Sequence, residues 1–420
     1  MFYDRTTMIE FERFRLDNGL TVIIHPDKST PMACLNILYD VGARDEDENK
    51  TGFAHLFEHL MFGGSINIPS YDEPLQLVGG ENNAFTTNDI TNYYCTVPAE
   101  NIETAFWLES DRMLSLAFTE KSLEVQRNVV IEEFKQRYLN QPYGDVWLLL
   151  RPLAYKTHPY KWATIGKEIA HIENAVMDDV KAFFKKHYKP CNAILVAAGN
   201  IEPAEVKALA QKWFGGIEGG RKPERQLPEE PKQTEARKLT VERDVPASAI
   251  YKVYHMCDRR DAEYHTVDII SDILSRGNSS RLYKTLIKEK QLFSDINAYV
   301  MGDLDRGLFV ISGKIPDGVS MEAAEQGIFA EIEKLKTEAL PETELQKCKN
   351  KIESTLTFSE TDVLTKATNL AISELLGDAH MVNTEVDKYA AVTRESVMQV
   401  AASMLREENC STLYYLAKKK

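Results

Sequence analysis

The sequence has few cysteines, no excess of positive charge and no long apolar run, and each absence excludes a class of protein. Its six cysteines are scattered over 420 residues without a Cys-x-x-Cys pair, so neither a disulfide framework nor a thiolate metal site is indicated. The formal net charge of −14, from 50 basic and 64 acidic residues, is the opposite of the basic field typical of nucleic-acid-binding proteins. We therefore expect no nucleic-acid partner.

The sequence also shows no pattern of apolar residues that would indicate a membrane-spanning or targeting segment. No stretch approaches the roughly 18 consecutive apolar residues of a membrane-spanning helix. The first five residues, Met1-Phe2-Tyr3-Asp4-Arg5, do not begin the apolar run of a signal peptide. We therefore expect no membrane association and a cytoplasmic location, or a periplasmic one if a leader had been removed. Hydrophobic residues at 43% and charged residues at 27% are typical of a globular protein.

The stretch from Gly52 to Phe62 places two histidines and a glutamate on a predicted apolar helix. His55 and His59 are four residues apart, so their imidazoles leave the same face one turn apart and can bind one zinc ion. Glu58 is close enough to take a proton from a water at that ion. The alternative is two core histidines beside a solvated glutamate, but the Leu, Phe and Met surroundings make an unpaired Glu58 costly. The pattern His-x-x-Glu-His is also the inverted form of a zinc-peptidase motif.

A zinc site in an enzyme needs a third protein ligand, and the predicted helix over residues 122–134 offers two candidates. Glu132 and Glu133 are neighbours and point about 100° apart. The residues that indicate a buried side of this helix are Val125, Val129 and Phe134. This pattern does not separate the two carboxylates, and two solvated glutamates on a charged helix remain the alternative.

Expected strands and helices follow from apolar periodicity and from turn residues. Strands are expected over 20–24, 33–39, 239–241, 249–255 and 411–416, with hairpins over 81–97 and 296–315. The fully apolar strand over 193–199 should be central and buried. A long helical stretch is expected from Ile102 to about Tyr138, and further helices over 203–214 and 262–274, with two more separated by Pro341.

The two halves of the chain repeat the same order of elements, which indicates duplication of one α+β unit. Residues 215–237 are rich in Gly, Pro and charge and nearly lack large apolar side chains, so they predict a linker. We predict an N-terminal metal-binding domain over 1–214 and a related domain over 238–420. Each half should be an α/β-sandwich-like unit, a mostly antiparallel sheet with helices packed on it. At the helix equivalent to the metal helix, the second half offers only His265 and Asp268.

Three motifs together resemble the pitrilysin/insulinase family of zinc metallopeptidases. They are His-x-x-Glu-His over 55–59, Gly-Gly-x-x-Asn-Ala-x-Thr over 79–86 and Arg-x-x-Val-x-x-Glu over 127–133. The resemblance covers nearly the whole chain, whose length is similar to that of the short members, such as mitochondrial processing peptidase subunits and bacterial relatives. It implies one Zn²⁺ per chain on His55, His59 and Glu133, with Glu58 as general base. It also implies an endopeptidase acting on extended or unfolded peptides in a chamber between the halves.

The same resemblance implies a substrate strand over 82–86, because an edge strand can pair with an extended peptide. Asn83, Ala84 and Phe85 are then expected substrate contacts, with an ordinary surface hairpin as the alternative. In the second half Ser279-Ser280-Arg281-Leu282 matches the family, which implies that Arg281 holds substrate carbonyls.

Two positions depart from the family pattern. Seven residues before Glu133 the family usually has a second Glu, whereas this chain has Gln126, an amide that can support the site but cannot act as a carboxylate. Where the family has a Tyr to accompany Arg281, this chain has Ser294 beside Phe293. Either this position has drifted, or the chain works as a homodimer or as a heterodimer with a subunit that carries the Arg–Tyr pair. A non-catalytic scaffold subunit, or a subunit that processes one dedicated substrate, is the competing hypothesis.

Overall fold

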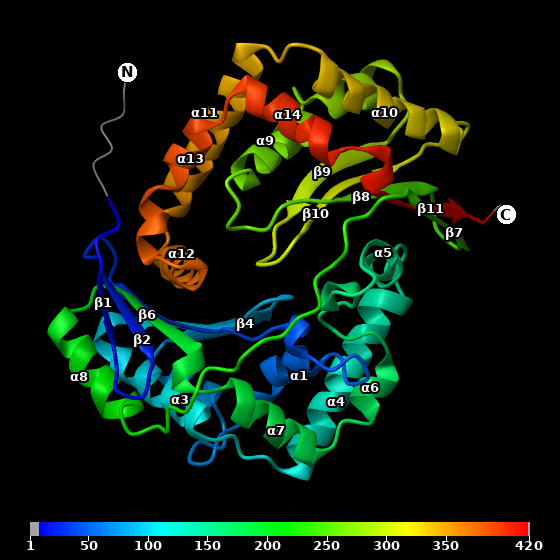
Figure 1. Ribbon diagram of the computed structural model, residues 1–420. Helices are drawn as coiled ribbons and strands as arrows, with labels where there is room; N and C mark the ends of the chain where they lie inside the picture. Colours follow the sequence, from blue (N-terminus) through cyan, green and yellow to red (C-terminus); the bar gives the residue numbers. More distant parts are fainter. Residues whose placement is uncertain (1–7, 419–420) are drawn as a thin grey trace. The chain divides into compact units, whose positions relative to one another are not determined.

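Two β-sheets form the framework of the structure, a computed structural model that describes residues 8–418 (Figure 1). The six-stranded sheet has the order β1 (Glu12–Arg15), β2 (Thr21–Pro26), β6 (Ala193–Gly199), β3 (Met32–Tyr39), β5 (Thr91–Pro98), β4 (Glu81–Thr86). The five-stranded sheet has the order β7 (Arg237–Arg243), β11 (Cys410–Ala417), β8 (Ala249–His255), β10 (Leu308–Lys314), β9 (Asp295–Met301). Residues 1–5, from which we predicted that no signal peptide begins the sequence, lie outside the described residues.

The two sheets have the same topology, apart from the additional strand β1. β2 pairs with β6 in parallel, as β7 does with β11, and every other neighbouring pair is antiparallel. The equivalent edge strands both contain Asn-Ala followed by an aromatic residue, Asn83-Ala84-Phe85 in β4 and Asn297-Ala298-Tyr299 in β9. The predicted α+β fold with two homologous halves is therefore confirmed.

Fourteen α-helices are present among residues 8–418, and most surround the two sheets. In the first half they are α1 (Phe53–Leu60), α2 (Asp72–Leu77), α3 (Ile102–Leu114), α4 (Glu120–Phe134), α5 (Val146–Ala154), α6 (Ile169–Glu173), α7 (Met177–His187) and α8 (Pro203–Phe214). In the second half they are α9 (Tyr264–Ser275), α10 (Met321–Thr337), α11 (Glu342–Ser359), α12 (Val363–Leu376), α13 (Glu385–Ala391) and α14 (Arg394–Met404).

The long helical stretch expected from Ile102 to about Tyr138 is interrupted in the structure, because the helix ends at Leu114. Ser115 is extended, and Leu116 forms a bridge with Ser65. A new helix, α4, then begins behind Thr119, whose side chain accepts a hydrogen bond from the backbone N–H of Ser122. A threonine at this position is a strong helix start. The break matters because α3 and α4 can then take different directions.

The structure forms two compact units that are discontinuous in sequence. Unit 1 comprises residues through 135, 162–227 and 357–384, and unit 2 comprises 136–161, 228–356 and the residues from 385 on. The sequence predicted contiguous domains separated by 215–237, whereas in the structure each unit also takes a segment from the other half. Residues 215–236 contain no helix or strand, and the change from unit 1 to unit 2 falls within them, after Leu227.

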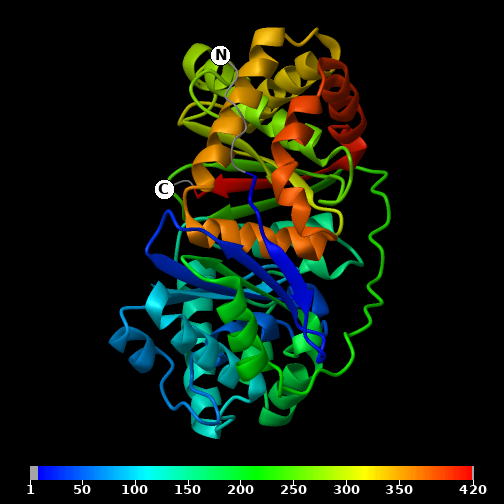
Figure 2. The same cartoon turned by 90° about the vertical axis from the view of Figure 1, so that its left-hand side faces the viewer.

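The segments that each unit takes from the other half, 357–384 in unit 1 and 136–161 in unit 2, cover one face of each sheet. In unit 1, α12 packs on β3 and β6, where Leu370 and Ala371 lie against alternate strand residues such as Leu38 and Val196 (Figures 1 and 2). In unit 2, α5 packs on β11, β7 and β8, with Leu150 in the same apolar cluster as Val253. The opposite face of the unit 1 sheet carries α1, α3 and α8. The strand β6 is fully buried, as expected for a central strand with helices on both faces.

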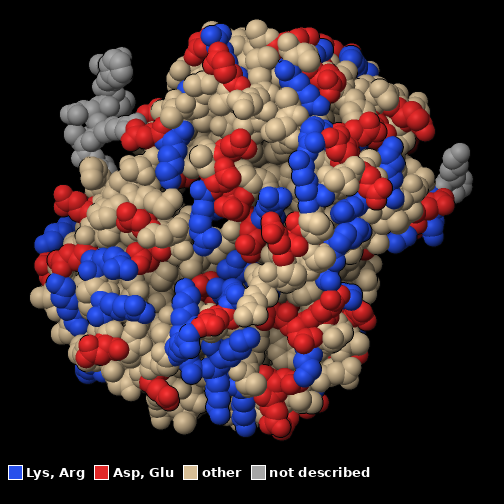
Figure 3. Space-filling model, in the orientation of Figure 1, with Lys and Arg blue, Asp and Glu red and all other residues tan. Residues whose placement is uncertain are grey.

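The described residues include no helix with the length and apolar character needed to cross a membrane. Lys and Arg side chains share the drawn face of the molecule with Asp and Glu (Figure 3). The net charge of −14 therefore does not produce a uniformly acidic surface on that face.

Candidate metal centre

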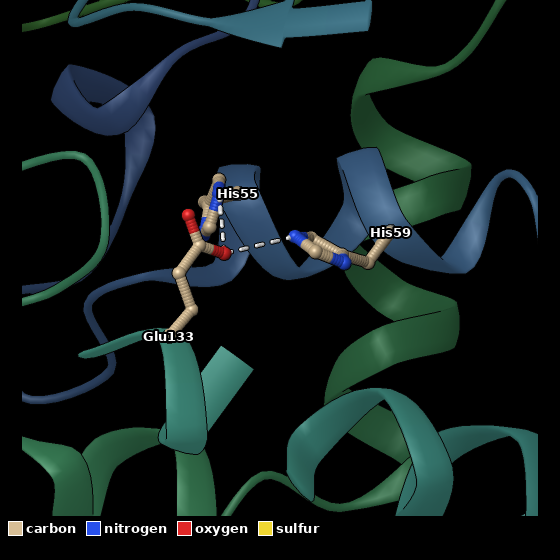
Figure 4. Close-up of side chains that lie close together, drawn as sticks. All are labelled: His55, His59 and Glu133. Atoms are coloured by element: carbon tan, nitrogen blue, oxygen red, sulfur yellow. Dashed lines mark ion pairs between the residues drawn. The ribbon is translucent and has the colours of Figure 1, made fainter. Parts of the chain in front are cut away.

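Helices α1 and α4 bring two histidines and a glutamate together in unit 1 (Figure 4). The Nε2 atoms of His55 and His59 lie 3.6 and 3.4 Å from the same oxygen, Oε2 of Glu133. One ligand atom from each of the three residues lies within 4.8 Å of the others. The carboxylate of Glu133 projects from α4 between the two imidazoles of α1.

This geometry suits a zinc ion. With zinc–ligand bonds of about 2.0–2.1 Å and tetrahedral angles, neighbouring ligand atoms lie about 3.3–3.5 Å apart. The observed distances of 3.6 and 3.4 Å are close to that separation. The side chains of His55, His59 and Glu133 are 12, 23 and 18% exposed, so the site is accessible for a fourth ligand. Two imidazoles, a carboxylate and one open position are the donor set of a catalytic zinc site.

The structure separates the two carboxylates that the sequence left equivalent. Glu132 is exposed and forms an ion pair with Lys135 at 2.7 Å, away from the histidines. The expected buried side of α4 is partly wrong, since Val125 and Val129 are 48 and 44% exposed. The residues of α4 that are buried are Leu123, Val130, Ile131 and Phe134. Packing of these side chains turns Glu133 toward α1.

Glu58 lies on α1 beside His59 and contacts the edge strand. Thr86, the last residue of β4, donates a hydrogen bond from Oγ1 to Oε2 of Glu58 at 2.5 Å. The sequence analysis placed Thr86 at the end of the expected substrate strand over 82–86 but predicted no contact with Glu58. The structure therefore adds a contact that fixes the carboxylate of Glu58 relative to the strand.

The strand β4 is the edge of the six-stranded sheet, with β5 on one side and no strand of the described chain on the other. Asn83 is exposed, and its Oδ1 accepts a hydrogen bond from the backbone N–H of Ala84 at 2.8 Å. Phe85 packs partly against the apolar cluster of α12, so part of its ring serves the core. Of the three expected contact residues, Asn83 is exposed, whereas Ala84 and Phe85 are half-buried.

The remaining predicted residues lie in different settings. Gln126 is partly exposed on α4, two turns before Glu133. Arg281 belongs to unit 2, where its guanidinium forms an ion pair with Glu344 at 2.8 Å. Ser294 is exposed and donates from Oγ to the carbonyl of Lys314 at 3.3 Å.

Glu46 is a further residue of this region that the sequence did not indicate. Its carboxylate accepts hydrogen bonds from the backbone N–H groups of Gly52 and Ala54 at the start of α1. Burial raises the pKa of Glu46 to about 8, against the two N–H groups, which lower it. No sequence pattern predicts that a glutamate in a loop will accept hydrogen bonds from a helix that begins seven residues later. This contact is therefore visible only in the structure.

The equivalent helix of the second half, α9, has a different arrangement. His265 Nε2 lies 3.0 Å from Oε1 of Glu385, and Tyr389 donates a hydrogen bond to Asp268 at 2.6 Å. The only group of three potential ligands within the described residues is that of His55, His59 and Glu133. The metal motif is therefore a feature of the first half alone.

The chain belongs to the insulinase family of peptidases, family M16. The sequence model described as "Insulinase (Peptidase family M16)" matches residues 21–163, and "Peptidase M16 inactive domain" matches residues 174–352. The chain is 33% identical over 347 residues to "Zinc protease PqqE" of Helicobacter pylori, a match that covers 80% of this chain and 77% of that protein.

Two further comparisons extend this result. The crystal structure of a protease from Helicobacter pylori superposes with a TM-score of 0.91 at 28% identity, covering 97% of this chain and all of that one. The beta subunit of the yeast mitochondrial-processing peptidase is 29% identical over 212 residues, which is 50% of this chain and 45% of that protein. The predicted family resemblance is thus confirmed, and the matched region of the first family model contains His55, Glu58, His59 and Glu133.

Proposed function

We propose that the protein is a zinc-dependent endopeptidase that cleaves extended or unfolded peptides. The observation that carries the proposal is the convergence of His55, His59 and Glu133 around one point, with Glu58 on the same helix. Relatives named zinc proteases support the metal and the reaction class.

In this proposal His55, His59 and Glu133 hold one Zn²⁺. When bound, the ion supplies a Lewis acid that lowers the pKa of water and polarises a peptide carbonyl. Glu58 accepts the proton of the attacking water and then delivers it to the nitrogen of the leaving amine. Thr86 orients the Glu58 carboxylate through its 2.5 Å hydrogen bond.

The edge strand β4 is the proposed binding strand for the peptide substrate. Its outer backbone groups can pair with an extended chain, which explains how a protease of this kind acts on many sequences. An added peptide would compete with Asn83 Oδ1 for the N–H of Ala84, and the freed Asn83 amide could then contact the peptide backbone. Folded proteins lack a free extended segment, so unfolded or short peptides are the proposed substrates.

We also propose that the chain acts as a dimer. Ser294 occupies the position where the resemblance implies a substrate-binding Tyr, and Arg281 is engaged by Glu344. A second subunit that carries the Arg–Tyr pair would supply both groups. The beta subunit of the mitochondrial-processing peptidase is by its name part of an assembly, which supports this idea. A scaffold function without catalysis would not require the four residues of the site, all of which this chain retains.

The test is metal analysis together with cleavage of a quenched fluorescent peptide by the purified chain, alone and with a candidate partner subunit. We expect one zinc per chain and cleavage that a chelator abolishes. Glu58→Gln should retain the zinc and lose activity by about 10²–10⁴-fold, because it removes proton transfer but no ligand. Retained cleavage in this variant would refute the assignment of Glu58, and absence of zinc binding by the wild type would refute the proposal as a whole.

A further inference from the structure

The carboxylate of Glu46 bridges the first turn of the helix that carries the candidate metal site. Its Oε2 accepts a hydrogen bond from the N–H of Gly52 at 2.9 Å, and its Oε1 accepts one from the N–H of Ala54 at 2.8 Å. Glu46 is only 9% exposed, so these hydrogen bonds are shielded from water. Both oxygens of this side chain therefore accept from the start of α1, and the side chain of Trp162 is a further hydrogen-bond partner of the carboxylate.

The start of α1 has no cap of its own. The N–H groups of the first turn of a helix have no partners within the helix, and a Ser, Thr, Asp or Asn at the preceding position usually accepts from one of them. In this chain Gly52 occupies that position with φ of 88°, and it has no side chain that could accept. A Cβ at Gly52 would lie 2.7 Å from the carbonyl oxygen of Ile165 and 2.7 Å from a methyl carbon of Ile172. The close packing therefore excludes a local cap, and Glu46 provides it from six residues earlier.

The helix that Glu46 caps is short, and it carries most of the site. α1 has eight residues and is thus about 12 Å long. His55 directly follows Ala54, the residue whose N–H is bound, and Glu58 and His59 are one turn further on. A shift of the first turn would change the distance of 3.6 Å between His55 Nε2 and Glu133 Oε2 first. A negative charge at this end also interacts favourably with the helix dipole.

We propose that Glu46 is a positioning residue of the metal centre, which holds the first turn of α1 where His55 meets Glu133. The proposal rests on the zinc site proposed above. Glu46 does not contact the ion or the substrate in this scheme and acts only through the backbone of α1. Loss of the carboxylate should therefore weaken metal binding and alter the coordination geometry, while the ligands themselves remain.

The experiment compares zinc affinity and the absorption spectrum of the Co²⁺-substituted protein among the wild type, Glu46→Gln, Glu46→Asp and Glu48→Gln. Glu48 is a matched control, because it is exposed and its ion pair with Lys167 is long, at 3.6 Å. The titrations are made in a zinc buffer at about pH 9, so that the carboxylate of Glu46 is ionised. Thermal unfolding and far-UV circular dichroism of the metal-free proteins are recorded in parallel.

We expect Glu46→Gln to weaken zinc binding by about 10–100-fold, the usual effect of losing a group that orients a ligand, and to change the Co²⁺ spectrum. Glu46→Asp should fall between the wild type and Glu46→Gln, and Glu48→Gln should match the wild type. Wild-type affinity and spectrum in Glu46→Gln, even with a lower melting temperature, would overturn the proposal and leave Glu46 a structural cap only. If Glu46→Gln does not fold, wild-type values in Glu46→Asp overturn it equally. Failure of the wild type to bind zinc would instead refute the proposed function.

Discussion

The hydroxyl of Thr86 donates a hydrogen bond to the carboxylate of Glu58 at 2.5 Å, and so it joins the edge strand β4 to the helix α1. The two residues are 28 positions apart in sequence. In the proposed mechanism this contact connects the strand that binds the peptide with the group that transfers the proton. Binding of substrate along β4 and orientation of the general base are therefore coupled by a single side chain.

Thr86→Val should lower kcat by about 10–100-fold, because a hydrogen bond to a charged group contributes about 1.5–3 kcal/mol and valine keeps the shape but not the donor. Zinc affinity should be unchanged, since Thr86 contacts no metal ligand. Thr86→Ser should restore most of the rate. Steady-state kinetics and zinc titration of the three proteins check this, and equal rates for Thr86→Val and wild type would contradict the role of Thr86.

Glu133→Gln should weaken zinc binding by about 100-fold or more, because a neutral amide replaces a charged ligand. Its neighbour provides a matched control, since Glu132 is exposed and paired with Lys135. Glu132→Gln should bind zinc like the wild type. Competition with a chromophoric chelator measures both affinities. The reverse result, with loss only in Glu132→Gln, would show that the helix α4 presents the other carboxylate.

Leu370→Ala in α12 should destabilise unit 1 by about 2–5 kcal/mol, although the residue lies in the second half of the sequence. Leu370 is fully buried in the cluster between α12 and the six-stranded sheet. Phe358→Ala is the control, because Phe358 is 73% exposed and its truncation should change stability by no more than about 0.5 kcal/mol. Urea denaturation of the full chain measures the effect. Similar stabilities for the two variants would argue against α12 as a cover of this sheet.

The stability of unit 1 should fall as pH decreases from 6.5 to 4 because of His187. The pKa of His187 is lowered to about 4, and burial is the main cause. The charges of Lys186 and Arg225 also lower this pKa, whereas those of Asp45 and Asp40 raise it. Between these pH values the unfolded chain binds a proton that the folded protein does not, so folding becomes less favourable by up to about 3 kcal/mol.

Urea denaturation of the metal-free protein between pH 7 and pH 4 tests this expectation. His187→Phe should remove this part of the pH dependence, because both ring nitrogens of His187 are buried without a hydrogen-bond partner among residues 8–418 and phenylalanine cannot titrate. His380→Gln, at an exposed position, should retain it. An unchanged pH dependence in His187→Phe would assign the effect to other groups.

Local sequence patterns correctly predicted those features that depend only on residues within one short segment. The spacing of His55 and His59 fixed both imidazoles on one face, because four residues make about one helical turn. The apolar run of 193–199 predicted a central strand, and β6 is fully buried. The break in the helical stretch over 102–138 was not predicted, because it depends on Leu116, which pairs with Ser65 some fifty residues earlier. A helix-forming composition cannot reveal such a partner.

The sequence by itself determined the duplicated α+β fold, the family and the pair of histidines, since these follow from periodicity and from motifs within short segments. Only the tertiary structure decided how α4 presents Glu133 to the histidines, which residue caps α1 and which helix covers each sheet. Those outcomes depend on how distant apolar surfaces pack, as α4 does through Val130 and Phe134. Packing sets the rotation and position of each helix, and no local pattern contains that information.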